Sequence, residues 1–429
     1  MKHAKISIYQ IIACAMVAVV ISYLPVKVVF PVIIVIIGLV FGLFLRQTFL
    51  SSVFILAFLS RIIFAIFLYN LVFLNNGLGL LGDSRSYSIN AVNIINLWSS
   101  GLRDLTALSI EALRLSDSGN LGSYDFWNAI VYYFAGVNPI TMIFINCVVS
   151  SLTAVLIYSI TKQIWNEKSA KFAACLTAFW PSTFFWSVQN LKEPLVIFLS
   201  VILLWAFIRL KKQFRFYMLL IILASTVALR YLRGFLLPLF YGVILPGSVL
   251  FSSKHKKVVL FWVVIFSAAA IVIIKLYHPN LIDPSRALKF LQQERAGRAY
   301  GNLGLATNFN IGNISNLIIF MPVFLANALL APYPWQVGSM SQISSMPEML
   351  LFYALIPLMF IGGKILIKNR SRESWILIFY ILIIALVLSV IEGNAGTLFR
   401  HRSMILPLCF ILIGVGLDKC NFRVSFHNQ

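Results

Sequence analysis

Apolar residues occur along most of the chain in long, nearly unbroken runs that are separated by short polar stretches. A helix of about 20 apolar residues crosses a bilayer, where it satisfies its own backbone hydrogen-bonding groups. Membrane-spanning helices are therefore expected at about residues 6–24, 28–45, 50–73, 140–161, 170–188, 194–208, 216–229, 234–251, 258–274, 349–363, 374–391 and 404–417. Polar and apolar residues do not alternate within these runs, which excludes a membrane β-barrel. The pattern predicts an all-α polytopic membrane protein with about 12 transmembrane helices.

The distribution of charge orients these helices. With the N-terminus in the cytoplasm, the cytoplasmic connections hold more than half of the 34 Lys and Arg residues, and their only acids are Glu167, Glu373 and Asp418. This follows the positive-inside rule, so the net charge of +21 reflects membrane topology and not nucleic-acid binding. A composition with 60% hydrophobic and 11% charged residues also excludes a soluble enzyme and a disordered chain.

The apolar run 314–331 is not counted as a span. The basic clusters at 254–257 and 364–372 both belong inside, so an even number of crossings separates them, and the runs 258–274 and 349–363 supply two. We therefore expect the run 314–331 to dip into the outer leaflet or to lie along it.

Two large outer loops result, at about 75–138 and 276–348. In the first loop, Leu102, Leu105 and Leu108 recur at helical spacing among polar residues. This pattern predicts short helices that lie on the membrane surface.

Asp83 lies in the first outer loop, just after the third predicted span, and Arg85 and Tyr87 follow it. A carboxylate at the mouth of a helix bundle, beside an apolar wall, is a candidate general base, because partial burial raises its pKa toward the working range. The alternative is that Asp83 caps the next helix, since Asp is a favoured N-cap residue.

A second acid, Glu193, lies beside Lys192 in a tight outer turn between the fifth and sixth predicted spans. Pro194 follows, which is typical of the start of a helix. Glu193 therefore either compensates the dipole of that helix or faces the same cavity as Asp83.

Cations near the outer ends of predicted helices form a third candidate set: Arg230, Arg233, Arg400, His401 and Arg402. Arginine binds phosphate in bidentate fashion, whereas the alternative role of such cations is to snorkel to lipid head groups. Arg61 lies inside the third predicted span, where a charge is a functional candidate by default, and the sequence shows no partner for it.

Sequence motifs for nucleotides and metals do not occur. The chain contains neither GxxxxGK[ST] nor GxGxxG, and no HExxH motif or Cys/His cluster suggests zinc. The five cysteines are odd in number and lie mostly in apolar runs, so they predict no disulfide framework. We expect no cofactor; the sequence indicates no metal site but leaves a requirement for a divalent metal ion open.

The order of motifs along the chain resembles the polytopic GT-C glycosyltransferases, in the bacterial branch related to protein O-mannosyltransferases and aminoarabinose transferases. The residues that carry the resemblance are Asp83, Asn138-Pro139, Asn146, Ala170, Ala173-Ala174, Trp180-Pro181-Ser182, the turn from Ser187 to Glu193, Pro332-Tyr333-Pro334-Trp335, and Arg400-His401-Arg402 with Pro407. The resemblance covers about residues 75–417 and is best at 138–208.

The resemblance implies an inverting glycosyltransferase on the outer face of a bacterial cytoplasmic membrane, in cell-envelope or exopolysaccharide synthesis. The donor would be a polyprenyl-phosphate-linked sugar, and the acceptor a glycan, a lipid or a protein. Asp83 would be the catalytic base, and Glu193 a second acid that positions acceptor or donor. The residues that would bind the lipid phosphate and the sugar are Arg85, Tyr87, Lys192, Arg230, Arg233, Arg400, His401 and Arg402. We expect these side chains to line one cavity.

The resemblance also divides the chain into two extra N-terminal transmembrane helices at 1–48, a GT-C-like catalytic core at 49–417 and a cytoplasmic tail at 418–429. Two other functions share some of these features. An O-antigen or exopolysaccharide polymerase or ligase has many helices, a large outer loop and outer arginines. A lipid-linked sugar flippase or transporter often contains inverted repeats, of which the sequence shows no convincing example.

Overall fold

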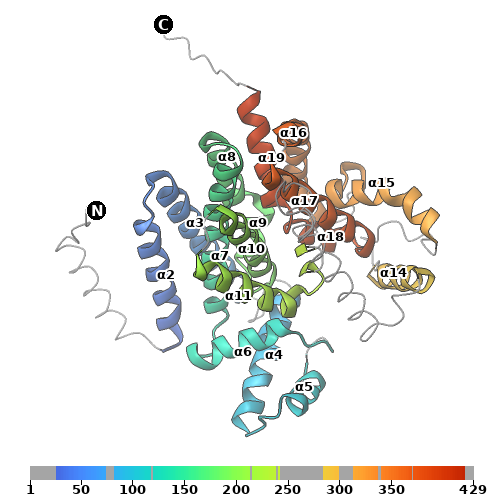
Figure 1. Ribbon diagram of the computed structural model, residues 1–429. Helices are drawn as coiled ribbons and strands as arrows, with labels where there is room; N and C mark the ends of the chain where they lie inside the picture. Colours follow the sequence, from blue (N-terminus) through green and yellow to red (C-terminus); the bar gives the residue numbers. More distant parts are fainter. Residues whose placement is uncertain are drawn as a thin grey trace, which may run out of the picture. The chain divides into compact units, whose positions relative to one another are not determined.

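The computed structural model describes residues 26–73, 82–116, 119–212, 215–237, 240–241, 284–298, 313–336, 340–369 and 371–420. Regular structure in these residues is helical throughout (Figure 1). The α-helices are α2 (Val26–Phe44), α3 (Thr48–Phe73), α4 (Gly82–Ser99), α5 (Leu105–Arg114), α6 (Ser123–Ala135), α7 (Pro139–Ile164), α8 (Glu167–Phe179), α9 (Pro181–Ser187), α10 (Glu193–Lys212), α11 (Phe216–Arg233), α14 (Pro284–Arg298), α15 (Ile314–Leu330), α16 (Met340–Asn369), α17 (Arg372–Ile391), α18 (Ala395–Arg402) and α19 (Leu406–Lys419), and η3 (Pro334–Gln336) is a short 3₁₀ helix.

Six helices of the described residues are long and apolar enough to cross a membrane, namely α3, α7, α10, α11, α16 and α17. The pair α18 and α19, which is bent by 61°, passes the same test together and is either one broken span or a re-entrant loop. These helices confirm the predicted all-α polytopic class. The predicted spans 6–24 and 258–274, and most of 234–251, lie outside the described residues, so the number of about 12 stays a prediction.

The chain forms two compact units, which are considered separately: residues 1–152 with 185–194, and residues 153–184 with 195–429. In the first unit, α4 packs mainly against α6 and also against α5. Helix α5 begins at an Asp104 cap, whose carboxylate accepts a hydrogen bond from Ala107 N at 2.7 Å. Helix α5 thus lies where the leucine spacing predicted a helix, with α4 before it and α6 after it along the chain. The position of these helices on a membrane surface stays a prediction.

In the second unit, α19 packs extensively against α16 and α8. Glycine makes this close approach feasible, because a Cβ atom at Gly362 would overlap the carbonyl oxygen of Leu412 and one at Gly416 would overlap that of Leu358. Small residues at such crossings let helix backbones pack closely in membranes. The apolar residues of α19 are therefore almost all buried.

One predicted span, 170–188, differs in the structure. The chain forms α8 and α9 there, and they are separated at Trp180, whose φ of −66° and ψ of 126° are extended. Pro181 explains the break, because proline disfavours helical backbone at the preceding residue and cannot donate a helical hydrogen bond.

Candidate active site

The predicted base, Asp83, lies in the first turn of α4 and its side chain is exposed. Arg85 on the same helix is also exposed, whereas Tyr87 is half-buried and packs edge-on against Tyr124 of α6 with 4.9 Å between ring centroids. A carboxylate in the first turn is favoured by the helix dipole whatever its further role. The exposed side chain lacks the partial burial on which the argument for a general base was based, and Asp83 lies within the first turn, after Gly82. Its role as the base stays a prediction.

The turn that leads to Glu193 is held by a buried amide. Asn190 is fully buried and donates through Nδ2 to Asn128 Oδ1 at 2.7 Å and to Ser88 Oγ at 3.2 Å. Ser88 lies on α4, the helix that also carries Asp83. Asn190 therefore ties the turn to both α4 and α6.

Two further buried side chains bind the backbone of the same turn. Asn146 of α7 donates to the carbonyl oxygens of Gln189 and Leu191 at 2.9 and 2.8 Å. The Tyr124 hydroxyl lies 3.0 Å from both Asn190 Oδ1 and Leu191 O. Burial raises the pKa of Tyr124 well above its ordinary value, so this hydroxyl stays protonated and can donate.

This network determines where Lys192 and Glu193 leave the turn. Glu193 is buried as the first residue of α10, and Lys192 is half-buried. The turn sequence was singled out in advance, but the partners Tyr124, Asn128 and Ser88 were not. Polar residues within the otherwise apolar α6 were the available signal.

A buried acid, Asp125, was also missed. Its Oδ1 accepts from Asn90 of α4 at 2.9 Å and its Oδ2 accepts from Gly122 N at 2.7 Å, at the start of α6. Burial raises the pKa of Asp125 above its ordinary value, although both hydrogen bonds favour the charged form. The bonds to backbone and amide groups point to a structural role in joining α4 to α6.

Arg61, the charge inside α3, has a partner far away in the sequence. Its Nε donates to Ser187 Oγ at 2.9 Å and its Nη1 donates to Ala57 O at 3.0 Å, and the side chain is fully buried. Ser187 is the last residue of α9, directly before the turn. Arg61 therefore fixes the turn at its first residue, Ser187, and Asn190 fixes it in the middle.

In the second unit, the predicted cations come from α11 and α18. Arg230 is exposed and Arg233 half-buried in the last turn of α11. Helix α18 starts at Asn394, whose Oδ1 accepts from Gly396 N and Thr397 N at 2.9 and 3.2 Å. This cap fixes the helix that ends with the three consecutive residues Arg400, His401 and Arg402.

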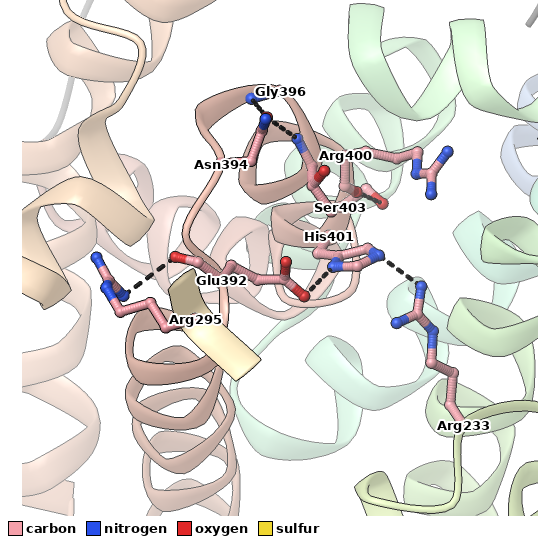
Figure 2. Close-up of polar contacts among 9 residues, drawn as sticks. Arg233, Arg295, Glu392, Asn394, Gly396, Arg400, His401 and Ser403 are labelled. Atoms are coloured by element: carbon pink, nitrogen blue, oxygen red, sulfur yellow. Dashed lines mark hydrogen bonds and ion pairs between the residues drawn. The ribbon is translucent and has the colours of Figure 1, made fainter. Parts of the chain in front are cut away.

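These three residues diverge, because successive side chains on a helix point about 100° apart. Arg402 is buried and donates to the carbonyl oxygens of Leu329 and Ala331 at 2.6 and 3.1 Å, at the end of α15. Such bonds favour a structural role for Arg402 over phosphate binding. Arg400 is half-buried, and its side chain points away from Glu392 (Figure 2).

His401 joins Arg233 to an acid that the sequence did not single out. His401 Nδ1 lies 2.8 Å from Glu392 Oε1, and its Nε2 lies 2.5 Å from Arg233 Nη2 (Figure 2). The backbone at Glu392 is held in turn by Arg295 of α14, whose Nη1 donates to the carbonyl oxygens of Ser389, Val390 and Glu392 at 2.8, 3.2 and 3.1 Å. Burial lowers the pKa of Arg295 to about 10, which leaves it charged at neutral pH.

In the first unit, Asp83, Arg85 and Tyr87 lie on one helix, α4, and Lys192 and Glu193 lie at the start of α10. In the second unit, Arg233 contacts His401. The structure directs Arg402 elsewhere. A single cavity lined by all of them stays a prediction. Within the described residues, no group of three or more His, Cys, Asp or Glu side chains is arranged to hold a metal ion. The predicted roles of all ten residues stay predictions.

The family comparison bears on this arrangement directly. Residues 124–274 match the family model of dolichyl-phosphate-mannose-protein mannosyltransferases. This confirms, over about a third of the chain, the resemblance to the GT-C glycosyltransferases of the protein O-mannosyltransferase branch. The matched stretch begins at Tyr124 and contains the turn with Glu193 and the end of α11 with Arg230 and Arg233. No curated protein and no solved structure matches the chain.

Proposed function

We propose that the chain is a membrane glycosyltransferase that moves a sugar from a polyprenyl-phosphate-linked donor to an acceptor on the outer face of a bacterial cytoplasmic membrane, in cell-envelope or exopolysaccharide synthesis. The observation that carries the proposal is the family match over residues 124–274, which supports a membrane glycosyltransferase with a lipid-linked donor. The apolar helices and the basic cytoplasmic connections agree with this setting.

The reaction assigns each group a task. Asp83 takes the proton from the acceptor hydroxyl, and the resulting oxygen attacks the anomeric carbon of the sugar from the side opposite the phosphate. The bond between that carbon and the phosphate oxygen breaks, so the sugar is transferred with inversion and polyprenyl phosphate leaves with the electron pair.

Cations stabilise the charge that develops on the departing phosphate. Arg233 and Arg400, at the ends of α11 and α18, are assigned this role, with Arg230 beside them on α11. Glu193 positions donor or acceptor, and its burial at the start of α10 suits a fixed orientation. Arg85, Tyr87 and Lys192 are assigned to the sugar and the phosphate.

Release of free lipid phosphate tests the proposal. The purified full chain is placed in vesicles with dolichyl-phosphate-mannose and other polyprenyl-phosphate sugars, together with candidate acceptors. A transferase releases polyprenyl phosphate in proportion to the sugar transferred. A flippase would move the lipid-linked sugar across the vesicle membrane without any release, and a polymerase or ligase would act only on lipid-linked oligosaccharides; either result would contradict the proposal.

A further inference from the structure

Three ionisable side chains from separate elements of the second unit form one hydrogen-bonded row, Glu392–His401–Arg233 (Figure 2). Glu392 follows the last residue of α17, His401 lies on α18 and Arg233 lies at the end of α11. The side chains of Glu392 and His401 are 2% and 4% exposed, so the hydrogen bond between them is shielded from water. The row was not visible in the sequence, because 168 residues separate Arg233 from His401.

The donors and acceptors assign a direction to this row. A guanidinium group can only donate hydrogen bonds, so His401 Nε2 must accept from Arg233 Nη2. The proton of the neutral imidazole is then on Nδ1, and it is donated to Glu392 Oε1. Glu392 therefore selects the tautomer of His401 that can hold Arg233, as carboxylates do for histidines at other functional sites.

The carboxylate itself stands on a fixed piece of backbone. Arg295 binds three carbonyl oxygens at the end of α17, including that of Glu392, and its guanidinium lies 4.2 Å from the centre of the Phe324 ring. Two residues later, Asn394 caps α18. The junction between α17 and α18 thus holds Glu392 and His401 in a defined relation.

We propose that Glu392 is a positioning residue, which acts through His401 to hold the Arg233 guanidinium in the orientation that binds the phosphate of the lipid-linked donor. This inference rests on the proposed function, which assigns Arg233 to that phosphate. An arginine side chain loses rotamer entropy when it is ordered, and a guanidinium held in advance avoids part of that loss on binding.

The test measures binding of dolichyl phosphate to the purified full chain in detergent, from the rise in melting temperature with lipid concentration. Arg233→Ala should weaken binding about tenfold to a hundredfold, as expected for loss of a hydrogen bond to a charged group. His401→Leu should weaken it to a similar extent. His401→Gln should restore most of the affinity, because its amide can accept from Arg233 and donate to Glu392.

A double-mutant cycle separates positioning from general destabilisation. Glu392→Leu, which leaves no acceptor for His401 Nδ1, should weaken binding in the wild-type background and have no further effect in Arg233→Ala. The matched control is Glu348→Leu, which alters another buried carboxylate of the same unit, one that accepts from Trp180 and Ser182. Its effect should be the same in both backgrounds.

The outcomes distinguish this inference from the proposed function. If Arg233→Ala weakens binding but Glu392→Leu and His401→Leu bind as wild type does, Glu392 has no positioning role and the proposed function stands. Equal binding by His401→Leu and His401→Gln would also overturn the inference, and that comparison does not depend on whether Glu392→Leu folds. Wild-type binding by Arg233→Ala would overturn both the inference and the role of Arg233 in the proposed function.

Discussion

Asn190→Ala tests whether the buried amide network supports the turn that carries Lys192 and Glu193. The substitution removes the hydrogen bonds from Nδ2 to Asn128 and Ser88 and the contact of Oδ1 with the Tyr124 hydroxyl. A net 0.5–1.5 kcal/mol for each bond, with Asn128 Oδ1 left without this donor, amounts to about 2–4 kcal/mol of lost stability. A unit of this size should then melt about 5–15 °C lower.

The measurement is the melting temperature of the purified full chain in detergent, followed by transfer activity well below that temperature. Activity should fall as well, because the turn no longer fixes the start of α10. The matched control is Asn93→Ala, which loses one exposed hydrogen bond to Leu115 O and should change stability by no more than about 0.5 kcal/mol. Equal melting temperatures for the two variants would refute the reasoning.

Three further predictions concern stability, all measured as melting temperature. Gly362→Ala should melt several degrees below wild type, because the new methyl group overlaps the backbone of α19. Its neighbour Gly363 has open space around it, so Gly363→Ala should melt at or above the wild-type value. The reverse order of melting temperatures would contradict the packing of α16 on α19. Arg402→Lys should lower the melting temperature, since a single ammonium group cannot reach both the two carbonyl oxygens that Nη1 binds and the Met349 sulfur to which Nη2 donates, and an unchanged value would remove its structural role. The buried Asp125 carboxyl has a raised pKa, so the native state keeps the Asp125 proton to higher pH than the unfolded chain does. The cost of burying the ionised carboxylate is therefore full at neutral pH and disappears as pH falls from the native pKa to the lower pKa of the unfolded chain. Over this pH range, wild type should gain stability relative to Asp125→Asn.

The helices could be predicted from the sequence because their signals are local. Apolar runs located α3, α7 and α17, and the leucine spacing located α5. The break between α8 and α9 was missed because the apolar run continues through it. Pro181 was the local signal that could have shown it.

The candidate site was less predictable because its contacts are not local. Residue type and position brought out Glu193 and Arg233, but nothing along the chain indicates that Arg61 meets Ser187, or that Arg233 meets His401. Arg400, His401 and Arg402 are consecutive basic residues on α18, and the sequence does not distinguish their roles. In the structure, His401 contacts Arg233 and Arg402 binds the end of α15. The spacing of Glu392 and His401, nine residues apart across a helix break, was the one local clue to the row at the end of α17.

Asp83→Asn tests the central claim most directly, with the release of free polyprenyl phosphate from a lipid-linked sugar that the wild-type chain turns over. If Asp83 is the base, the rate should fall by about 10²–10⁴-fold, the usual contribution of a general base, while the melting temperature stays close to that of wild type. Asp104→Asn is the matched control, an exposed loop acid whose cap an asparagine can replace, and it should keep the wild-type rate. A full rate of release from purified Asp83→Asn would contradict the account.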